Sequence, residues 1–113
     1  MSGLTTHVLD TAIGRPAAGV AVRLMRNGAV LVSTRTNSDG RCDSPLMSGD
    51  AIAAGAYRLE FDVGAYFRAM GVALPDPAFL DTVAIEFGVA DASAHYHVPL
   101  LVSPFGYSTY RGS

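Results

Sequence analysis

Apolar and polar side chains alternate with a period of two residues along most of this sequence. In the segment AYRLEFDV (56–63), four apolar side chains alternate with three charged ones: Tyr57, Leu59, Phe61 and Val63 against Arg58, Glu60 and Asp62. Successive side chains of a β-strand point to opposite faces, so this pattern predicts a strand with one buried face. The segments VAIEFGV (83–89) and YHVPLLV (96–102) repeat it. An all-β fold is therefore expected.

Turn signals separate the predicted strands. VAVRLM (20–25) and VLVSTRT (30–36) flank Asn27-Gly28, the residue pair that favours a type I′ hairpin. TNSDGR (36–41) supplies a turn through Asp39-Gly40, and Pro104-Phe105-Gly106 separates YHVPLLV from YSTYR (107–111). One helix is predicted over 65–70, ended by Gly71. Seven or eight short strands with one short helix predict an antiparallel β-sandwich in a single domain spanning 1–113.

Composition narrows the functional classes. Only 16% of the residues are charged while 50% are apolar, a balance that leans toward an oligomer because little charge is available to cover the surface. The net charge is −2 and the chain has no lysine, so neither nucleic-acid binding nor Schiff-base chemistry is expected. Cys42 is the one cysteine, which excludes a disulfide within the chain. No signal peptide and no apolar run of about 20 residues is visible, so we expect a cytoplasmic protein without a membrane span.

All three histidines lie on predicted strands. In the segment 95–103, Tyr96, Val98, Leu100 and Val102 form an apolar face, and the opposite face carries His95, His97, Pro99, Leu101 and Ser103. The two histidines should therefore point away from the core. Pro99 cannot donate a ladder hydrogen bond, which predicts an edge strand or a bulge. In LTTHVLD (4–10), His7 lies on the face opposite Leu4, Thr6 and Val8.

Three chemistries are compatible with these residues. His7, His95 and His97 form an acceptable set of zinc ligands. Serine hydrolysis is the least favoured, since GYSTY only half matches the Gly-x-Ser-x-Gly motif. The third is metal-free acid–base hydrolysis, in which histidine moves protons and the planar fork of an arginine holds an anionic or carbonyl-rich substrate. The residues place the third slightly above the first and leave the choice open.

The terminal segment HYHVPLLVSPFGYSTYRGS (95–113) closely resembles the C-terminal signature of the 5-hydroxyisourate hydrolases, the enzymatic relatives of transthyretin. THVLDTAIGRPAAGVAV (6–22) resembles their N-terminal signature, and TNSDGR resembles the segment that carries the family's arginine. YRLEFDVGAYF (57–67) matches the stretch that leads into the helix. The chain departs from the family at FLDTVAIEF, where Asp81 and Thr82 replace a frequent Pro-Glu pair.

The resemblance implies a transthyretin-like antiparallel β-sandwich of about eight strands, assembled as a homotetramer that is a dimer of dimers. It also implies hydrolysis of 5-hydroxyisourate to 2-oxo-4-hydroxy-4-carboxy-5-ureidoimidazoline in urate breakdown, with no cofactor and no metal. Its catalytic residues are carried over to His7, Arg41, His97 and Ser113. Substrate binding falls on His7, Arg41 and Tyr110, with support from His95, Arg111 and Gly112, and the terminal segment is expected to fold into a cleft between subunits.

We expect His97 or His7 to deprotonate a water molecule, because neutral imidazole is abundant at cellular pH. Arg41 would polarise the attacked carbonyl or hold the urate-like anion, and the Ser113 hydroxyl or terminal carboxylate would orient a histidine. Two alternatives remain. A small-molecule binding protein such as transthyretin resembles the enzyme with the HYH and YRGS residues lost, and this chain retains both. A metallohydrolase would use His7, His95 and His97 as ligands.

Overall fold

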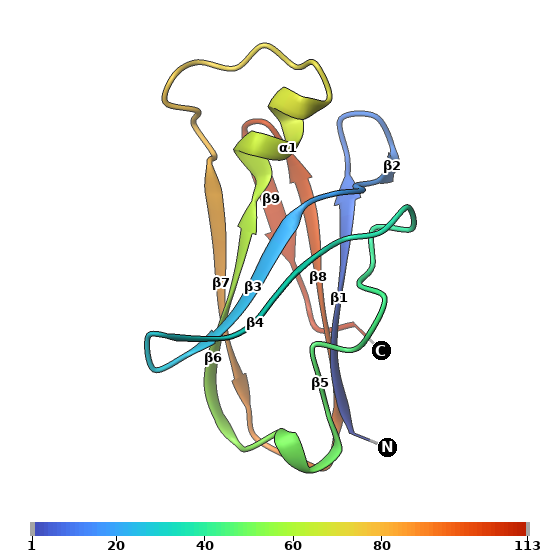
Figure 1. The fold of residues 1–113 in the computed structure, drawn as a ribbon, viewed down its shortest axis with the longest axis vertical. Coiled ribbons are helices and arrows are strands. Elements are labelled where there is room, and N and C mark those ends of the chain that lie inside the picture. Colours follow the sequence, from blue (N-terminus) through green and yellow to red (C-terminus); the bar gives the residue numbers. More distant parts are fainter. Residues whose placement is uncertain (1, 113) are drawn as a thin grey trace.

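The computed structural model describes residues 2–112, which form two β-sheets packed against each other (Figure 1). The first sheet has the order β2-β1-β8-β9, with β5 also paired to β1; the bounds are β1 (Gly3–Asp10), β2 (Arg15–Pro16), β5 (Met47–Ser48), β8 (His95–Ser103) and β9 (Gly106–Thr109). The second sheet has the order β4-β3-β6-β7, with β3 (Ala21–Arg26), β4 (Ala29–Arg35), β6 (Gly55–Asp62) and β7 (Thr82–Val89). The predicted all-β sandwich is confirmed, with two of its strands only two residues long.

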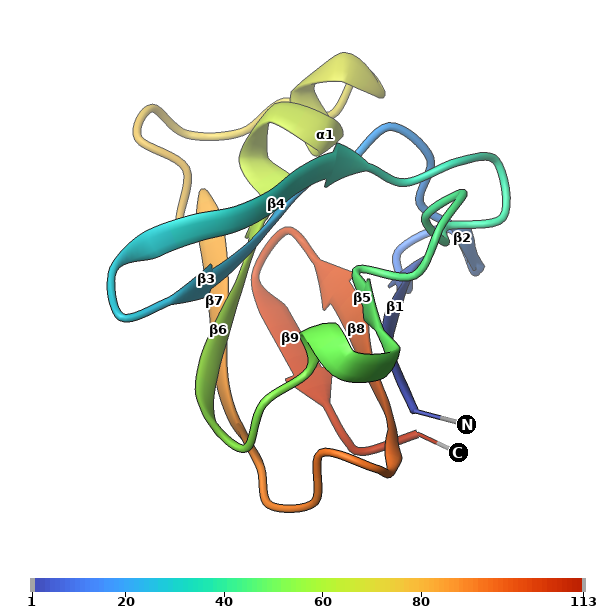
Figure 2. The ribbon, with the colours of Figure 1, turned by 60° about the horizontal axis from the view of Figure 1, so that its bottom comes forward.

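The two sheets enclose one apolar core, and the alternation in the sequence determines which side chains enter it. Leu24, Leu59, Phe61 and Leu100 are fully buried between the layers that Figure 2 shows from a second direction. The four apolar residues of β8 expected in the core are all buried, namely Tyr96, Val98, Leu100 and Val102. Burying a leucine or phenylalanine side chain stabilises a fold by roughly 1.5–3 kcal/mol, so this core supplies the main support for the strands that carry polar groups outward.

The local turn chemistry follows the sequence closely. Asn27 and Gly28 both have positive φ, at 53° and 79°, as a type I′ turn requires, and they join β3 to β4. The helix α1 (Val63–Ala69) begins two residues before the predicted start and ends one residue early, with Gly71 at φ 85° just beyond it. A 3₁₀ turn, η1 (Gly49–Ala51), follows β5. Gly106 begins β9 instead of closing the turn, and Tyr110 and Arg111 lie beyond the end of that strand.

Within residues 2–112, β1 and β8 are the one pair of strands that run parallel, and all other pairs are antiparallel. Parallel neighbours need a long connection, and here nearly the whole chain lies between them. This pairing places the first strand beside the terminal segment, as both views show (Figures 1 and 2). The two ends of the sequence that carry histidines therefore meet in one sheet.

Pro99 lies on an interior strand, so the expectation of an edge strand or a bulge is wrong. β8 is flanked by β1 and β9, and its pairing with each runs without a register shift. Gly112 donates to the His97 carbonyl oxygen on the β9 side, and strand residues two apart face the same neighbour, so Pro99 also faces that side. The residue pairs of β9 end at Thr109, opposite Leu100. The missing N–H of Pro99 thus falls where the neighbouring strand has already ended.

A buried polar contact joins the helix to the first sheet. The Tyr66 hydroxyl donates to Asp10 Oδ2 at 2.8 Å, and the Ala12 N–H donates to Asp10 Oδ1 at 3.0 Å. Burial, and next the hydrogen bond to Asp10, raise the pKa of Tyr66 to about 12, so the phenol stays a donor. No helix among the described residues is long and apolar enough to cross a membrane.

Candidate active site

The parallel pairing of β1 with β8 brings polar side chains from both ends of the sequence onto one face. Thr5 is the partner of His97 in this register, and His7 is the partner of Pro99. Since side chains alternate along both strands, His7 and His97 point away from the core on the same face. Both are half-buried, and their ring centroids lie 6.4 Å apart. His95 lies further along the same face and is exposed.

A tight turn delivers Arg41 to the histidines. The Asn37 side chain accepts the Asp39 N–H at 2.9 Å, and Gly40 adopts φ 74°. Gly40 then passes so close to β1 that its carbonyl oxygen accepts the Val8 N–H at 2.7 Å. A Cβ at Gly40 would overlap the Val8 carbonyl oxygen, so glycine is required there. The next residue, Arg41, forms a β-bridge with His7.

The segment after β9 closes the other side of the site. The Gly112 N–H donates to the His97 carbonyl oxygen at 2.8 Å. The Arg111 guanidinium stacks 4.1 Å from the centroid of the Tyr96 ring and donates to the His95 carbonyl oxygen at 3.2 Å. Such stacking holds an arginine in a fixed direction. Tyr110 stays 60% exposed, while Ser113 lies outside the described residues.

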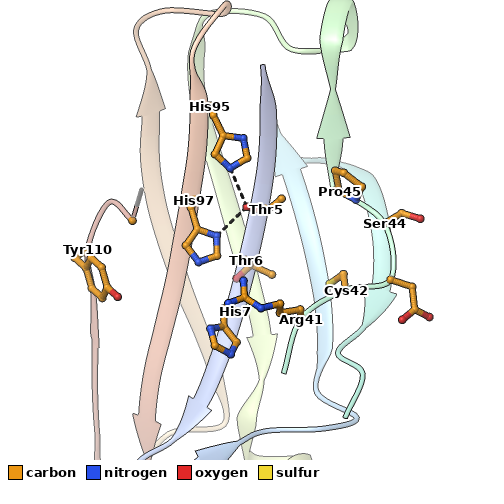
Figure 3. Close-up of a pocket in the computed structure, with 12 residues that line it drawn as sticks. Thr5, Thr6, His7, Arg41, Cys42, Ser44, Pro45, His95, His97 and Tyr110 are labelled. Carbon is orange, nitrogen blue, oxygen red and sulfur yellow. Dashed lines mark hydrogen bonds between the residues drawn. The ribbon is translucent and has the colours of Figure 1, made fainter. Parts of the chain in front are cut away.

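These groups surround an open cleft of about 550 Å³, shown in Figure 3. Six residues expected from the sequence line it: His7, Arg41, His95, His97, Tyr110 and Gly112. Arg111 does not line this cleft, because its side chain is turned onto Tyr96. A cleft of this size accommodates a small ring compound with water.

The electrostatics of the cleft favour neutral histidines. Burial lowers the pKa of His7 below its ordinary value, and the positive charge of Arg41 lowers it further. Burial likewise lowers the pKa of His97, followed by the charges of Arg41, His7 and His95. An uncharged imidazole can accept a proton, so near neutral pH both rings are available as bases.

Comparison with known proteins places this arrangement in a family. The profile of the HIUase/Transthyretin family matches residues 4–112. The chain belongs to this family. It is 62% identical over 117 residues to the 5-hydroxyisourate hydrolase of Ralstonia nicotianae, with both chains fully covered. It resembles the structure of Klebsiella pneumoniae 5-hydroxyisourate hydrolase, with TM-score 0.85, 38% identity and full coverage of both chains. Sea bream transthyretin in complex with thyroxine is also similar, with TM-score 0.83 and 28% identity over 97% of this chain and 94% of that one.

The described part of the sandwich does not bring a set of metal ligands together. Among residues 2–112, no three side chains of His, Cys, Asp or Glu are grouped so that they could hold a metal ion. His95 and His97 each turn one ring nitrogen to the hydroxyl of Thr5. The three-histidine ligand set considered from the sequence is therefore not formed.

Several residues of the cleft were missed by the sequence reasoning. Thr5 and Thr6 line it, as do the four residues after Arg41, namely Cys42, Asp43, Ser44 and Pro45. Thr5 could have been found, because it shares a strand face with His7 two residues away. The segment 42–45 carries no periodic pattern, and only the position of Arg41 beside β1 brings it to the cleft. Burial, and next the charge of Asp43, raise the pKa of the Cys42 thiol, which disfavours a thiolate nucleophile.

Proposed function

We propose that this protein hydrolyses 5-hydroxyisourate to 2-oxo-4-hydroxy-4-carboxy-5-ureidoimidazoline in urate breakdown. The observation that carries the proposal is the convergence of His7, His97 and Arg41 on one cleft, from three segments far apart in the sequence. The similarity of the whole chain to proteins named 5-hydroxyisourate hydrolase supplies the substrate.

Water is the nucleophile in this reaction. His97 or His7 takes one proton from water while the water oxygen forms a bond to the ring carbonyl carbon, whose π electrons move onto the carbonyl oxygen. Arg41 stabilises that developing negative charge with a rigid, permanently charged fork of N–H donors. The carbonyl re-forms as the carbon–nitrogen bond of the ring breaks, and the protonated histidine returns its proton to the leaving nitrogen.

The residues after β9 position the substrate. Tyr110 projects from the end of the strand at the rim of the cleft, where an exposed aromatic ring can stack on a planar heterocycle. Arg111 donates to the His95 carbonyl oxygen and Gly112 donates to that of His97, so both residues tie this segment to β8. Gly112 also lines the cleft, whereas Arg111 does not. The role of Ser113 stays a prediction.

The test is to measure the decay of 5-hydroxyisourate freshly generated by uricase, with and without the protein, by absorbance. The protein should accelerate the decay well above the spontaneous rate, and His97→Asn should remove most of that acceleration. A chelator should leave the rate unchanged, whereas loss with the chelator and recovery with zinc would favour the metallohydrolase alternative. Failure to accelerate the decay at all would instead revive a binding protein of the transthyretin kind.

We propose a homotetramer, built as a dimer of dimers, for the assembled protein. The resemblance of the sequence to the 5-hydroxyisourate hydrolases implies this assembly. Among residues 2–112, β7 and β9 are each the last strand of a sheet and have one edge without a strand partner, and such edges are templates for pairing with another chain. Large exposed side chains near one end of the sandwich, among them Ile13, Phe79 and Phe105, also need cover.

Light scattering after size exclusion should give four times the chain mass at micromolar concentration, and a fully active monomer would contradict the proposal. The cytoplasmic location stays a prediction.

A further inference from the structure

The hydroxyl of Thr5 lies between two histidine rings (Figure 3). Thr5 Oγ1 is 2.8 Å from Nδ1 of His97, and a longer contact of 3.4 Å joins it to Nε2 of His95. The parallel register of β1 and β8 makes Thr5 the direct partner of His97, so the backbone of the sheet fixes this distance. The hydrolytic steps described above do not use Thr5.

A hydroxyl has one hydrogen to donate and two lone pairs to accept, so Thr5 can donate to one of the two rings at most, and the proton on Nδ1 of His97 depends on which ring that is. In one order, His95 donates to Thr5 and Thr5 donates to Nδ1 of His97, which places the His97 proton on Nε2. In the other order, Nδ1 of His97 carries the proton and donates to Thr5, and Thr5 donates to Nε2 of His95. The two orders differ in whether Nε2 of His97 carries a hydrogen or a free lone pair.

The charge of Arg41 selects between them. Figure 3 shows the His97 ring between Thr5 on one side and His7 with Arg41 on the other, so Nε2 faces the arginine side of the cleft. Guanidinium stays protonated at any ordinary pH. An N–H pointing toward that cation places positive beside positive, whereas a lone pair pointing toward it is stabilised. The order with the proton on Nδ1 of His97 is therefore favoured.

We propose that Thr5 is a positioning residue that holds His97 as its Nδ1–H tautomer, with the Nε2 lone pair turned into the cleft. If the proposed hydrolysis is correct, this lone pair is the acceptor of the water proton. The hydrogen bond from Nδ1 to Thr5 becomes charge-assisted once Nε2 is protonated, so it also stabilises the imidazolium that forms beside Arg41. The contact with Thr5 thus favours His97 over His7 as the general base.

The tautomer can be measured without substrate. In the full-length protein labelled with ¹⁵N-histidine, nitrogen shifts recorded above the titration of His97 should show a protonated Nδ1 and a bare Nε2. Thr5→Val keeps the branched shape but removes the hydroxyl, and it should shift His97 toward the Nε2–H form, while Thr5→Ser should keep the wild-type shifts. A wild-type His97 protonated on Nε2, or shifts unchanged in Thr5→Val, would overturn the proposal whatever the two variants do to stability.

Kinetics on the same proteins give a second test. Thr5→Val should lower kcat about tenfold, the order expected for one hydrogen bond to a charged group, with KM nearly unchanged. Thr5→Ser should restore most of the loss. The matched control is Thr11→Val, which removes a hydroxyl that donates from the turn just after β1 to the Val102 carbonyl oxygen of β8 at 3.1 Å, away from the cleft. An equal loss of kcat in Thr11→Val, or an effect of Thr5→Val on KM alone, would refute the positioning role.

A wild type that does not hydrolyse 5-hydroxyisourate would refute the proposed function, and the nitrogen shifts would still decide the tautomer.

Discussion

Pro99 lies opposite Tyr110 along the continued register of β8 and β9. The ladder pairs Leu100 with Thr109, and beyond a gap it resumes where His97 meets Gly112. Pro99 has no N–H to offer to Tyr110, and the Thr109 hydroxyl donates to the Pro99 carbonyl oxygen at 2.7 Å. The interruption releases Tyr110 from regular pairing at the rim of the cleft. A proline in an interior strand thus shapes the site instead of marking an edge.

Removing the residues from Tyr110 onward should abolish hydrolysis while leaving a folded oligomer. Tyr110 and Arg111 are exposed, so the truncation takes little from the core. It removes the aromatic rim of the cleft and the N–H of Gly112 that bonds to the His97 carbonyl oxygen. The assay of 5-hydroxyisourate decay should be accompanied by a thermal melt and a sizing column.

A point variant provides the control for the truncation. Tyr107→Phe changes an exposed tyrosine on β9 that does not line the cleft, and it should keep wild-type turnover. Undiminished hydrolysis by the truncated chain would show that the terminal residues have no part in the reaction. Unfolding of the truncated chain would show that their role is structural.

Arg41→Lys should lose most activity at little cost to stability. A lysine ammonium is a point charge and cannot place two N–H groups on one carbonyl or anion as a guanidinium does. Arg41 is exposed, and exposed charges contribute about 0–1 kcal/mol to stability. Turnover and melting temperature should be compared with Arg15→Lys, an exposed substitution on β2 away from the cleft. Near wild-type turnover in Arg41→Lys would mean that Arg41 takes no part.

The two faces of β8 should respond differently to substitution. His97→Asn removes a proton acceptor and should lower kcat by about 10²-fold or more with a small change in stability. Leu100→Ala opens a cavity in the core and should destabilise the fold by roughly 2–5 kcal/mol, because Leu100 is fully buried. Denaturant unfolding and turnover of both variants test this. The reverse pattern, in which His97→Asn unfolds and Leu100→Ala is merely inactive, would contradict the assignment of the faces.

Strand faces could be predicted from the sequence, but strand partners could not. The period of two fixes which side chains of β8 are buried, whatever lies next to it. The pairing of Thr5 with His97 joins residues 92 positions apart, and no local pattern encodes it. The contact between Tyr66 and Asp10 is equally non-local, since it depends on how α1 packs on the first sheet. Such contacts follow from the complete topology.

The features of the candidate site were likewise predictable from the sequence only in part. The outward direction of His7 and His97 could be read from alternation, whereas their meeting with Arg41 was expected only from the resemblance to a family. The structure shows why they meet: Gly40 packs directly against Val8, and this contact places Arg41 beside β1. The cleft residues 42–45 had no signal, because their place depends on that contact alone.

The acid limit of the reaction should lie below the ordinary pKa of histidine. Burial and the charge of Arg41 lower the pKa values of His7 and His97 below 6.5, so the neutral base persists as the pH falls past that value. The rate constant kcat/KM should stay level from about pH 8 to neutrality and decline only through the lowered pKa, where protonation removes the acceptor.

Arg41→Gln removes one of the two main causes of the lowered pKa values and leaves burial in place, so the pKa of both rings should rise toward 6.5. Proton NMR titration of His7 and His97 in both proteins measures this rise even if the variant is inactive. A kcat/KM that already declines at or above pH 6.5, or titrations that Arg41→Gln does not move, would argue against histidine bases tuned by Arg41.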